Sequence, residues 1–142
     1  MKSTIVIGLG FGDEGKGSIV DALVRKNEAI KTIVRFNGGS QAAHHVVRDD
    51  GNWHCFSQFS SGTFQQKTRT WLSEFMLIDP LAILREEQAL QKHNIHDALE
   101  RLYIDEHCVV ITPFHKYLNR LQERSLGNNR NGSCGMGVGW AW

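Results

Sequence analysis

A run of glycines between an apolar stretch and a helix-forming stretch constrains this 142-residue chain more than any other feature. Residues 4–7 are β-branched, five of the ten residues in 8–17 are glycine, and residues 18–26 place apolar side chains at helical spacing. A second apolar run at 32–36 completes the pattern of a βαβ unit with a right-handed parallel crossover. The glycine loop is then expected at the carboxyl end of a strand, where open α/β sheets bind ligands.

Further short elements follow along the chain. Two runs, 46–48 and 53–56, flank Asp49-Asp50-Gly51-Asn52, which predicts a surface hairpin with an Asp-Gly turn. Asp79-Pro80 predicts the N-cap and the first residue of a helix that extends to about residue 93. Strands are also expected at 103–105 and 108–112, a helix at 113–121, loops at 125–131 and 132–139, and no regular element at 140–142.

These elements predict an α/β fold with a P-loop-like, mostly parallel sheet, flanking helices and a β-hairpin insertion. Because the glycine loop at 132–139 has no element after it, we expect the chain to be truncated relative to its ancestral fold. Within the predicted helices, the acidic pair Glu86-Glu87 is expected to be solvated. The leucines expected to face the core are Leu81, Leu84, Leu90 and Leu99.

Composition excludes several functional classes. Lysine and arginine number 16 and aspartate and glutamate 15, so the net charge of +1 gives no field to hold a nucleic acid or an anionic membrane. Three widely spaced cysteines favour a reducing compartment, and the run at 5–7 is too short for a signal core or a membrane span. We therefore expect a cytoplasmic protein that binds neither nucleic acid nor membrane.

The first glycine loop comes close to the phosphate-loop pattern G-x-x-x-x-G-K-[ST]. Gly10, Gly15 and Lys16 match the pattern, and Gly17 replaces its hydroxyl residue. Glycines let backbone N–H groups point at phosphate oxygens, and the helix N-terminus and a lysine add positive charge. A phosphate cradle is therefore predicted, but without the usual hydroxyl ligand for magnesium.

Two acidic residues lie inside this predicted cradle. Asp13 is a candidate magnesium ligand or general base. The alternative is a structural role, in which Asp13 caps the following helix. For Glu14, a helix-dipole partner and a ligand contact are equally good interpretations.

A second cluster, Asn37-Gly38-Gly39-Ser40-Gln41-Ala42-Ala43-His44-His45, follows the second predicted strand. Adjacent histidines usually point in different directions, so the pair alone indicates no site. Its place beyond that strand, however, predicts that it lies near the first loop.

Four sequence segments that follow one another in a fixed order identify a family together, although none of them would do so alone. They are Gly12-Asp13-Glu14-Gly15-Lys16-Gly17 with Ile19-Val20-Asp21, Val34-Arg35-Phe36-x-Gly38-Gly39-x-x-Ala42-x-His44, Ser61-Gly62 with Asp79-Pro80, and Gly132-x-x-Gly135-x-Gly137-x-Gly139. Together they resemble the adenylosuccinate synthetase family, and the resemblance implies that residues 1–142 are the N-terminal nucleotide-binding part of a longer domain.

The resemblance implies a magnesium-dependent, GTP-driven ligation of L-aspartate to C6 of IMP in purine nucleotide biosynthesis, carried out by a homodimer. In the implied mechanism Asp13 takes the N1 proton of IMP, the 6-oxygen attacks the γ-phosphate of GTP, and His44 supports that transfer before aspartate displaces phosphate. The implied magnesium ligands are Asp13 and the carbonyl of Ala43. The implied nucleotide-binding residues are Gly12, Asp13, Glu14, Gly15, Lys16, Gly17, Ser18, Gln41, Ala42, Ala43, His44, His45, Ser133 and Cys134.

The chain departs from the family pattern in both later loops. Gln41-Ala42-Ala43-His44 replaces Asn-Ala-Gly-His, and a positive φ at Ala43 would be strained. The residues that replace two threonines, an arginine and a proline in the late loop are Ser133, Cys134, Met136 and Trp140. These departures leave open IMP or dGMP as the purine, since phage relatives of the family use dGMP, and leave open a catalytically impaired nucleotide-binding module. A phosphate-loop hydrolase is disfavoured by Gly17 and by the lack of a Walker-B aspartate.

Overall fold

The computed structural model describes residues 2–10 and 12–142, and its centre is a parallel sheet. The sheet has the order β1-β4-β6, and both of its strand pairs are parallel. Its strands are β1 (Thr32–Arg35), β4 (Arg69–Leu72) and β6 (Leu102–Ile104). A second parallel pair joins β5 (Leu77–Ile78) to β7 (Val109–Val110). The predicted fold class, a mostly parallel sheet with flanking helices, is confirmed.

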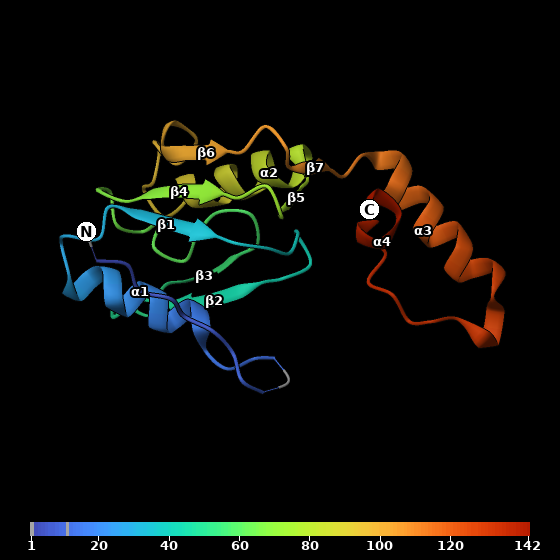
Figure 1. The fold of residues 1–142 in the computed structure, drawn as a ribbon, viewed down its shortest axis with the longest axis horizontal. Coiled ribbons are helices and arrows are strands. Elements are labelled where there is room, and N and C mark those ends of the chain that lie inside the picture. Colours follow the sequence, from blue (N-terminus) through green and yellow to red (C-terminus); the bar gives the residue numbers. More distant parts are fainter. Residues whose placement is uncertain (1, 11) are drawn as a thin grey trace.

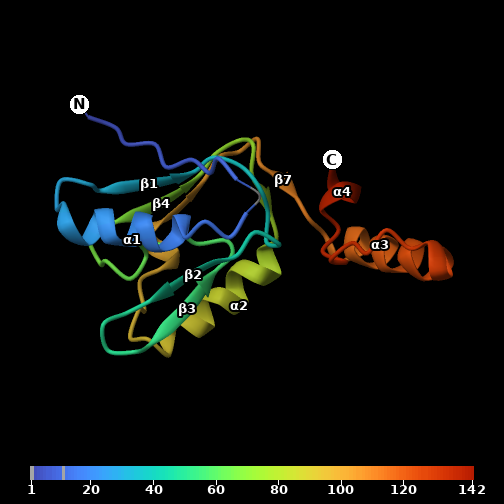
Figure 2. The same cartoon turned by 90° about the horizontal axis from the view of Figure 1, so that it is seen from below.

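The predicted hairpin is formed by β2 (His44–Val47) and β3 (Trp53–Phe56), which pair antiparallel. Gly51 in its turn has φ +80°, which explains the glycine of the Asp-Gly pair. The helices are α1 (Lys16–Lys26), α2 (Pro80–Gln91), α3 (Pro113–Ser125) and α4 (Val138–Ala141). Helix α4 shows that the end of the chain has a regular element, where none was expected. The hairpin, α1 and α2 lie on one side of the sheet, and α3 with α4 stands apart beyond β7 (Figures 1 and 2).

The strand predicted at residues 4–7 is wrong. No described residue before α1 belongs to a strand, and Ile5, Ile7 and Leu9 are largely exposed. Strand β1 pairs with β4, so only the helix and the second strand of the expected βαβ unit are present. A strand of a parallel sheet is stabilised by cover on both faces, and the exposure of these side chains shows that residues 4–9 have no such cover.

The hydrophobic core lies between the sheet, the hairpin and α2. Helix α2 begins as predicted, with the Asp79 side chain accepting a hydrogen bond from the Ala82 N–H at 3.2 Å. The largest members of the core, all fully buried, are Phe56, Phe59, Leu72, Met76 and Leu90.

Helix α2 turns a different face to the core than its leucines suggest. Leu90 is buried as expected, but Leu81 and Leu84 of this helix are exposed, as is Leu99 farther along the chain. Glu86, expected in solvent, is buried. The buried face is formed by Ala82, Ile83, Glu86 and Leu90, because backbone donors of the segment after β3 bind the Glu86 carboxylate. Within the described residues, no helix is both long and apolar enough to span a bilayer.

The two faces of α2 predict different costs for the same substitution. Leu90 has an exposed fraction of 0% and Leu84 of 50%. We expect Leu90→Ala to lower the free energy of unfolding by about 2–5 kcal/mol through lost burial and a cavity. Leu84→Ala should stay within about 0.5 kcal/mol of the parent chain. Urea denaturation followed by circular dichroism measures both, and equal costs would show that the leucine pattern identified the buried face after all.

Candidate functional site

Positive backbone angles shape the first glycine loop. Gly12 has φ +103°, Asp13 φ +36° and Gly15 φ +72°, and Gly15 is the N-cap of α1. A positive φ is costly for a side-chain-bearing residue, and such strain is concentrated at functional sites. Among the described residues nothing donates a hydrogen bond to the exposed Asp13 carboxylate. Asp13 is therefore held in a strained conformation, and no donor of the described residues occupies its carboxylate.

The Glu14 carboxylate occupies the centre of the loop. Its Oε1 accepts hydrogen bonds from the N–H groups of Leu9 at 2.8 Å and Gly10 at 2.6 Å, and its Oε2 lies 2.8 Å from Lys16 Nζ. These contacts, the one to Lys16 foremost, lower the pKa of Glu14 below its ordinary value. A Cβ on Gly8 would lie 1.9 Å from Glu14 Oε2, so residue 8 must be glycine for this arrangement. The backbone N–H groups and the lysine that were expected to bind a phosphate thus bind the carboxylate of Glu14 instead.

Gly17 packs directly against the second cluster. A Cβ at this position would lie 2.7 Å from the Cβ of His44 and 3.1 Å from Ser61 Oγ. The next residue, Ser18, donates a hydrogen bond from Oγ to the carbonyl of His45 at 3.2 Å. The departure from the phosphate-loop pattern at Gly17 has a steric cause, because the start of β2 fills the place of a side chain. The two glycine clusters are in contact, as the sequence predicted.

The backbone of the second cluster is a tight turn. Gly38 has φ +97°, and the N–H of Ala42 donates to the carbonyl of Gly39 at 3.0 Å. The carbonyl of Ala42 accepts from the Arg35 guanidinium at 3.3 Å. Ala43 is not among the described residues with positive φ, so the strain considered for this alanine does not arise.

The two adjacent histidines have different surroundings. His44 is half-buried, and its pKa is lowered by desolvation, by the positive charge of Arg35 and by that of Lys16. His45 is exposed, stacks on Trp53 with ring centroids 5.3 Å apart, and places Nδ1 3.5 Å from Cys55 Sγ. The lowered pKa favours the neutral imidazole form of His44 beside the loop, whereas His45 belongs to the surface of the hairpin.

The donor set for a magnesium ion is small. No three acidic, histidine or cysteine side chains of the described residues gather into a metal cluster. Magnesium commonly takes only one or two carboxylates from the protein and completes its shell with water and substrate phosphates. The free Asp13 carboxylate and the Ala43 carbonyl are hard oxygen donors that fit this requirement.

The late glycine loop is held by α3. Asn119 donates from Nδ2 to Ser133 Oγ at 2.9 Å and accepts from the N–H of Gly137 at 3.2 Å. Cys134 is exposed. In the described part of the chain no hydrogen bond joins Ser133 or Cys134 to the first two loops, and both figures show α3 apart from α1 (Figures 1 and 2).

A pocket of about 520 Å³ nevertheless joins the end of the chain to the second cluster. Gly38 and Gln41 contribute from the second cluster, and Val138 and Trp142 from α4 and the residue after it. Gln41 is among the residues that the family resemblance implies for nucleotide binding, and Trp142 is not.

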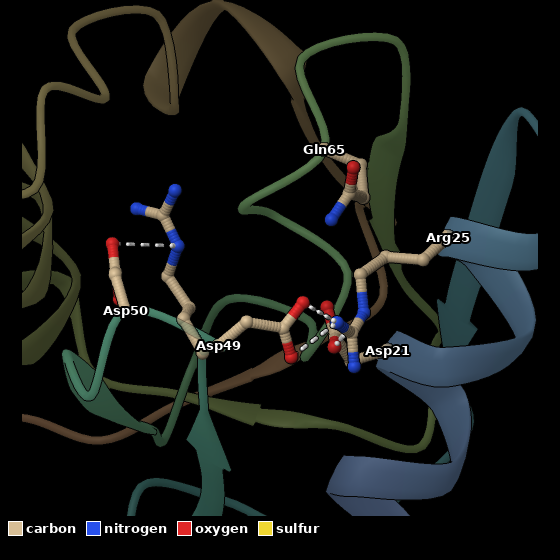
Figure 3. A pocket seen from close by; sticks show the side chains of 6 residues that line it. Asp21, Arg25, Asp49, Asp50 and Gln65 are labelled. Atoms are coloured by element: carbon tan, nitrogen blue, oxygen red, sulfur yellow. Dashed lines mark hydrogen bonds and ion pairs between the residues drawn. The ribbon is translucent and has the colours of Figure 1, made fainter.

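A second pocket, of about 240 Å³, lies elsewhere, between α1 and the hairpin turn (Figure 3). Arg25 Nε lies 2.8 Å from Asp21 Oδ2, and Arg25 NH1 lies 3.2 Å from Asp49 Oδ2. Asp21 is buried, and desolvation raises its pKa despite the opposing charge of Arg25. These contacts fasten the hairpin turn to α1, and the pocket contains none of the predicted site residues.

The fold and the loops define an α/β protein in which a glycine loop at the start of a helix packs against a histidine-bearing turn. A family model described as adenylosuccinate synthetase matches residues 5–142, and the chain belongs to this family. It is 34% identical over 141 residues to the adenylosuccinate synthetase of Actinobacillus succinogenes and 35% identical to that of Acidithiobacillus ferrooxidans. In each case the alignment covers 99% of this chain and 32% of the relative, so the chain spans about a third of their length.

Two solved structures have a similar fold. A fully ligated adenylosuccinate synthetase from Plasmodium falciparum superposes with a TM-score of 0.77 and 25% identity, over 90% of this chain and 29% of that one. The succinoaminodeoxyadenylate synthetase of cyanophage S-2L, bound to dGMP and to dATP as an energy donor, gives a TM-score of 0.67 at 24% identity. That match covers 92% of this chain and 34% of the phage protein.

The contact between Gly17 and His44 predicts a steric penalty. Gly17→Ala should lower the free energy of unfolding by about 1–3 kcal/mol, because the new methyl group has no room beside the His44 Cβ. The matched control is Gly139→Ala, since a Cβ there meets nothing within 4 Å. Thermal unfolding measures both variants. A Gly17→Ala chain as stable as the control would mean that the two clusters do not pack this closely.

The position of Glu14 predicts competition with phosphate. Glu14→Gln removes the resident negative charge, so tripolyphosphate should bind roughly two- to fivefold more tightly, the effect expected of one exposed ion pair. Isothermal titration calorimetry at low salt measures this, with the exposed Glu28→Gln as the control. Weaker binding in Glu14→Gln would instead show that Glu14 contacts the ligand or maintains the loop.

Proposed function

We propose that the chain binds a purine mononucleotide and GTP across its two glycine clusters and serves in the GTP-dependent ligation of L-aspartate to the purine. The observation that supports this proposal is the packing of Gly17 against His44, because it brings the loop that contains the strained Asp13 next to the histidine. Membership of the adenylosuccinate synthetase family supports the reaction class.

Asp13 and His44 have the proposed catalytic roles. The free carboxylate of Asp13 takes the N1 proton of the purine, and the electrons of that bond make the 6-oxygen a nucleophile. The 6-oxygen bonds to the γ-phosphorus of GTP as the bond to GDP breaks, and His44 stabilises the charge of the transferring group. The amine of L-aspartate then attacks C6, and phosphate leaves.

The remaining binding roles follow the geometry of the loops. The N–H groups of residues 9, 10 and 15–18 and the Lys16 ammonium hold phosphate oxygens after Glu14 has moved aside. Asp13 and the Ala43 carbonyl hold Mg²⁺, which supplies charge neutralisation for the phosphates. Gln41 and the late-loop residues Ser133 and Cys134 bind the purine nucleotide, IMP or dGMP. A homodimer and a cytoplasmic location are part of the same proposal.

A second candidate function is a nucleotide-binding module without turnover. It is favoured by one observation, that the chain matches only about a third of each curated relative. Binding of nucleotide would then persist without formation of the aspartate adduct.

Calorimetric titration with IMP, dGMP and GTP, each with magnesium, followed by an assay for the aspartate adduct, tests both candidates. We expect binding and product from the parent chain, and loss of product with an intact fold from Asp13→Asn, which keeps the size of the side chain but removes the base. Binding without product supports the module, and unchanged turnover in Asp13→Asn removes Asp13 from its role. If no nucleotide binds, both proposals fail.

A further inference from the structure

Arg35, at the end of β1, is a buried cation bound almost entirely by backbone. It has an exposed fraction of 8%. Its NH1 donates to the carbonyl of Ser57 at 2.6 Å and to that of Phe59 at 3.1 Å, and its NH2 donates to the carbonyl of Ala42 at 3.3 Å. The planar, multidentate guanidinium thus joins the segment after β3 to the turn of the second glycine cluster.

Glu86, on α2, binds the other side of the same segment. It has an exposed fraction of 6%, and its carboxylate accepts from the N–H groups of Ser57 at 3.0 Å, Gln58 at 2.7 Å and Phe59 at 3.3 Å. It also accepts from Ser57 Oγ at 2.7 Å. Residues 57–59 therefore direct carbonyls at a buried cation and N–H groups at a buried anion, which fixes their backbone.

The Ala42 contact connects this framework to the proposed site. Ala42 directly precedes Ala43 and His44, and its own N–H donates to the carbonyl of Gly39 in the same turn. The carbonyl of Gly38 accepts from the N–H of Leu77 at 2.8 Å. A hydrophobic residue would fill the interior position of Arg35 without the cost of burying a charge. The guanidinium is useful there because it reaches the turn.

We propose that Arg35 is a positioning residue of the nucleotide site, which fixes the Ala42 carbonyl and thereby the backbone of Ala43 and His44. Glu86 holds Arg35 in place through residues 57–59. This inference rests on the proposed function only for its effect on nucleotide binding, because the geometry of the turn can be measured in the free chain.

Arg101 offers a matched control within the same chain. Its guanidinium also binds backbone carbonyls, donating to Gln65 at 3.2 Å, Thr68 at 2.6 Å and Thr63 at 3.2 Å, and it pairs with Asp97 at 2.8 Å. None of these contacts involves the second glycine cluster. Lysine at either position keeps the charge but loses the planar fork.

The test compares Arg35→Lys with Arg101→Lys in the full 142-residue chain. In Arg35→Lys we expect altered amide chemical shifts and faster hydrogen exchange at Ala42, Ala43 and His44, and nucleotide affinity lower by about tenfold or more, the scale for loss of a supporting contact. Arg101→Lys should leave these amides and the affinity unchanged. Glu86→Gln, a second variant, should move the same three amides by a smaller amount.

Equal effects of the two lysine variants on residues 42–44 would overturn the positioning role. If the parent chain binds no IMP, dGMP or GTP, the proposed function fails and the amide measurement alone decides this inference. Displaced amides in Arg35→Lys then support it, and unchanged amides overturn it. If Arg35→Lys does not fold, Glu86→Gln decides in the same way.

Discussion

The buried Glu86 carboxylate is the contact on which the arrangement of the fold depends. Removing a carboxylate from water costs several kcal/mol unless donors replace the lost hydration, and residues 57–59 supply three N–H groups and a hydroxyl. The same residues bind Arg35 through their carbonyls, so α2, the segment after β3 and the end of β1 are joined by one set of hydrogen bonds. The direction of α2 follows from this set, because the helix presents Glu86 together with Leu90 to the interior and leaves Leu81 and Leu84 exposed.

The parallel sheet has a covered face and an open face, and this explains where sequence patterns succeed and fail. Val34, Trp71 and Tyr103 are exposed and lie in register across β1, β4 and β6, with Trp71 and Tyr103 stacked 5.9 Å apart. Parallel sheets are normally covered on both faces. The β-branched run at 4–7 resembles that at 32–36, yet only the second forms a strand, because strand formation depends on neighbours that a local pattern does not record. Strand β4 was missed because Arg69 and Thr70 interrupt its apolar character.

The candidate site was predictable where it depends on backbone and local spacing. The glycines, Lys16 and the proximity of His44 follow from motif geometry, and the structure supplies the reason for Gly17. Arg35 and Glu86 escaped prediction because their signals are misleading. Arg35 sits at the end of an apolar run, and Glu86 lies in an acidic pair that is typical of a solvated helix face. Their burial is set by hydrogen-bond partners 22 to 29 positions away in the sequence. Such long-range partners, carbonyls for Arg35 and N–H groups for Glu86, leave no periodic pattern in the sequence.

The negative charge of Glu14 in the first glycine loop gives a physical reason for magnesium in the proposed reaction. A phosphate that enters this loop replaces the contacts of Glu14 to Leu9, Gly10 and Lys16. The binding free energy of the phosphate is therefore reduced by the free energy of the Glu14 contacts that are broken. The displaced carboxylate, together with Asp13, then lies beside a polyanion with only Lys16 as a nearby cation in the loop. Because Asp13 and Glu14 are exposed, solvent screens part of this repulsion. A divalent cation held by Asp13 would offset the remaining repulsion by neutralising charge on the phosphates. Asp13 and Glu14 against Lys16 give the empty loop a net charge of −1. Under the proposed function a nucleotide polyanion would therefore bind more tightly with magnesium than without it.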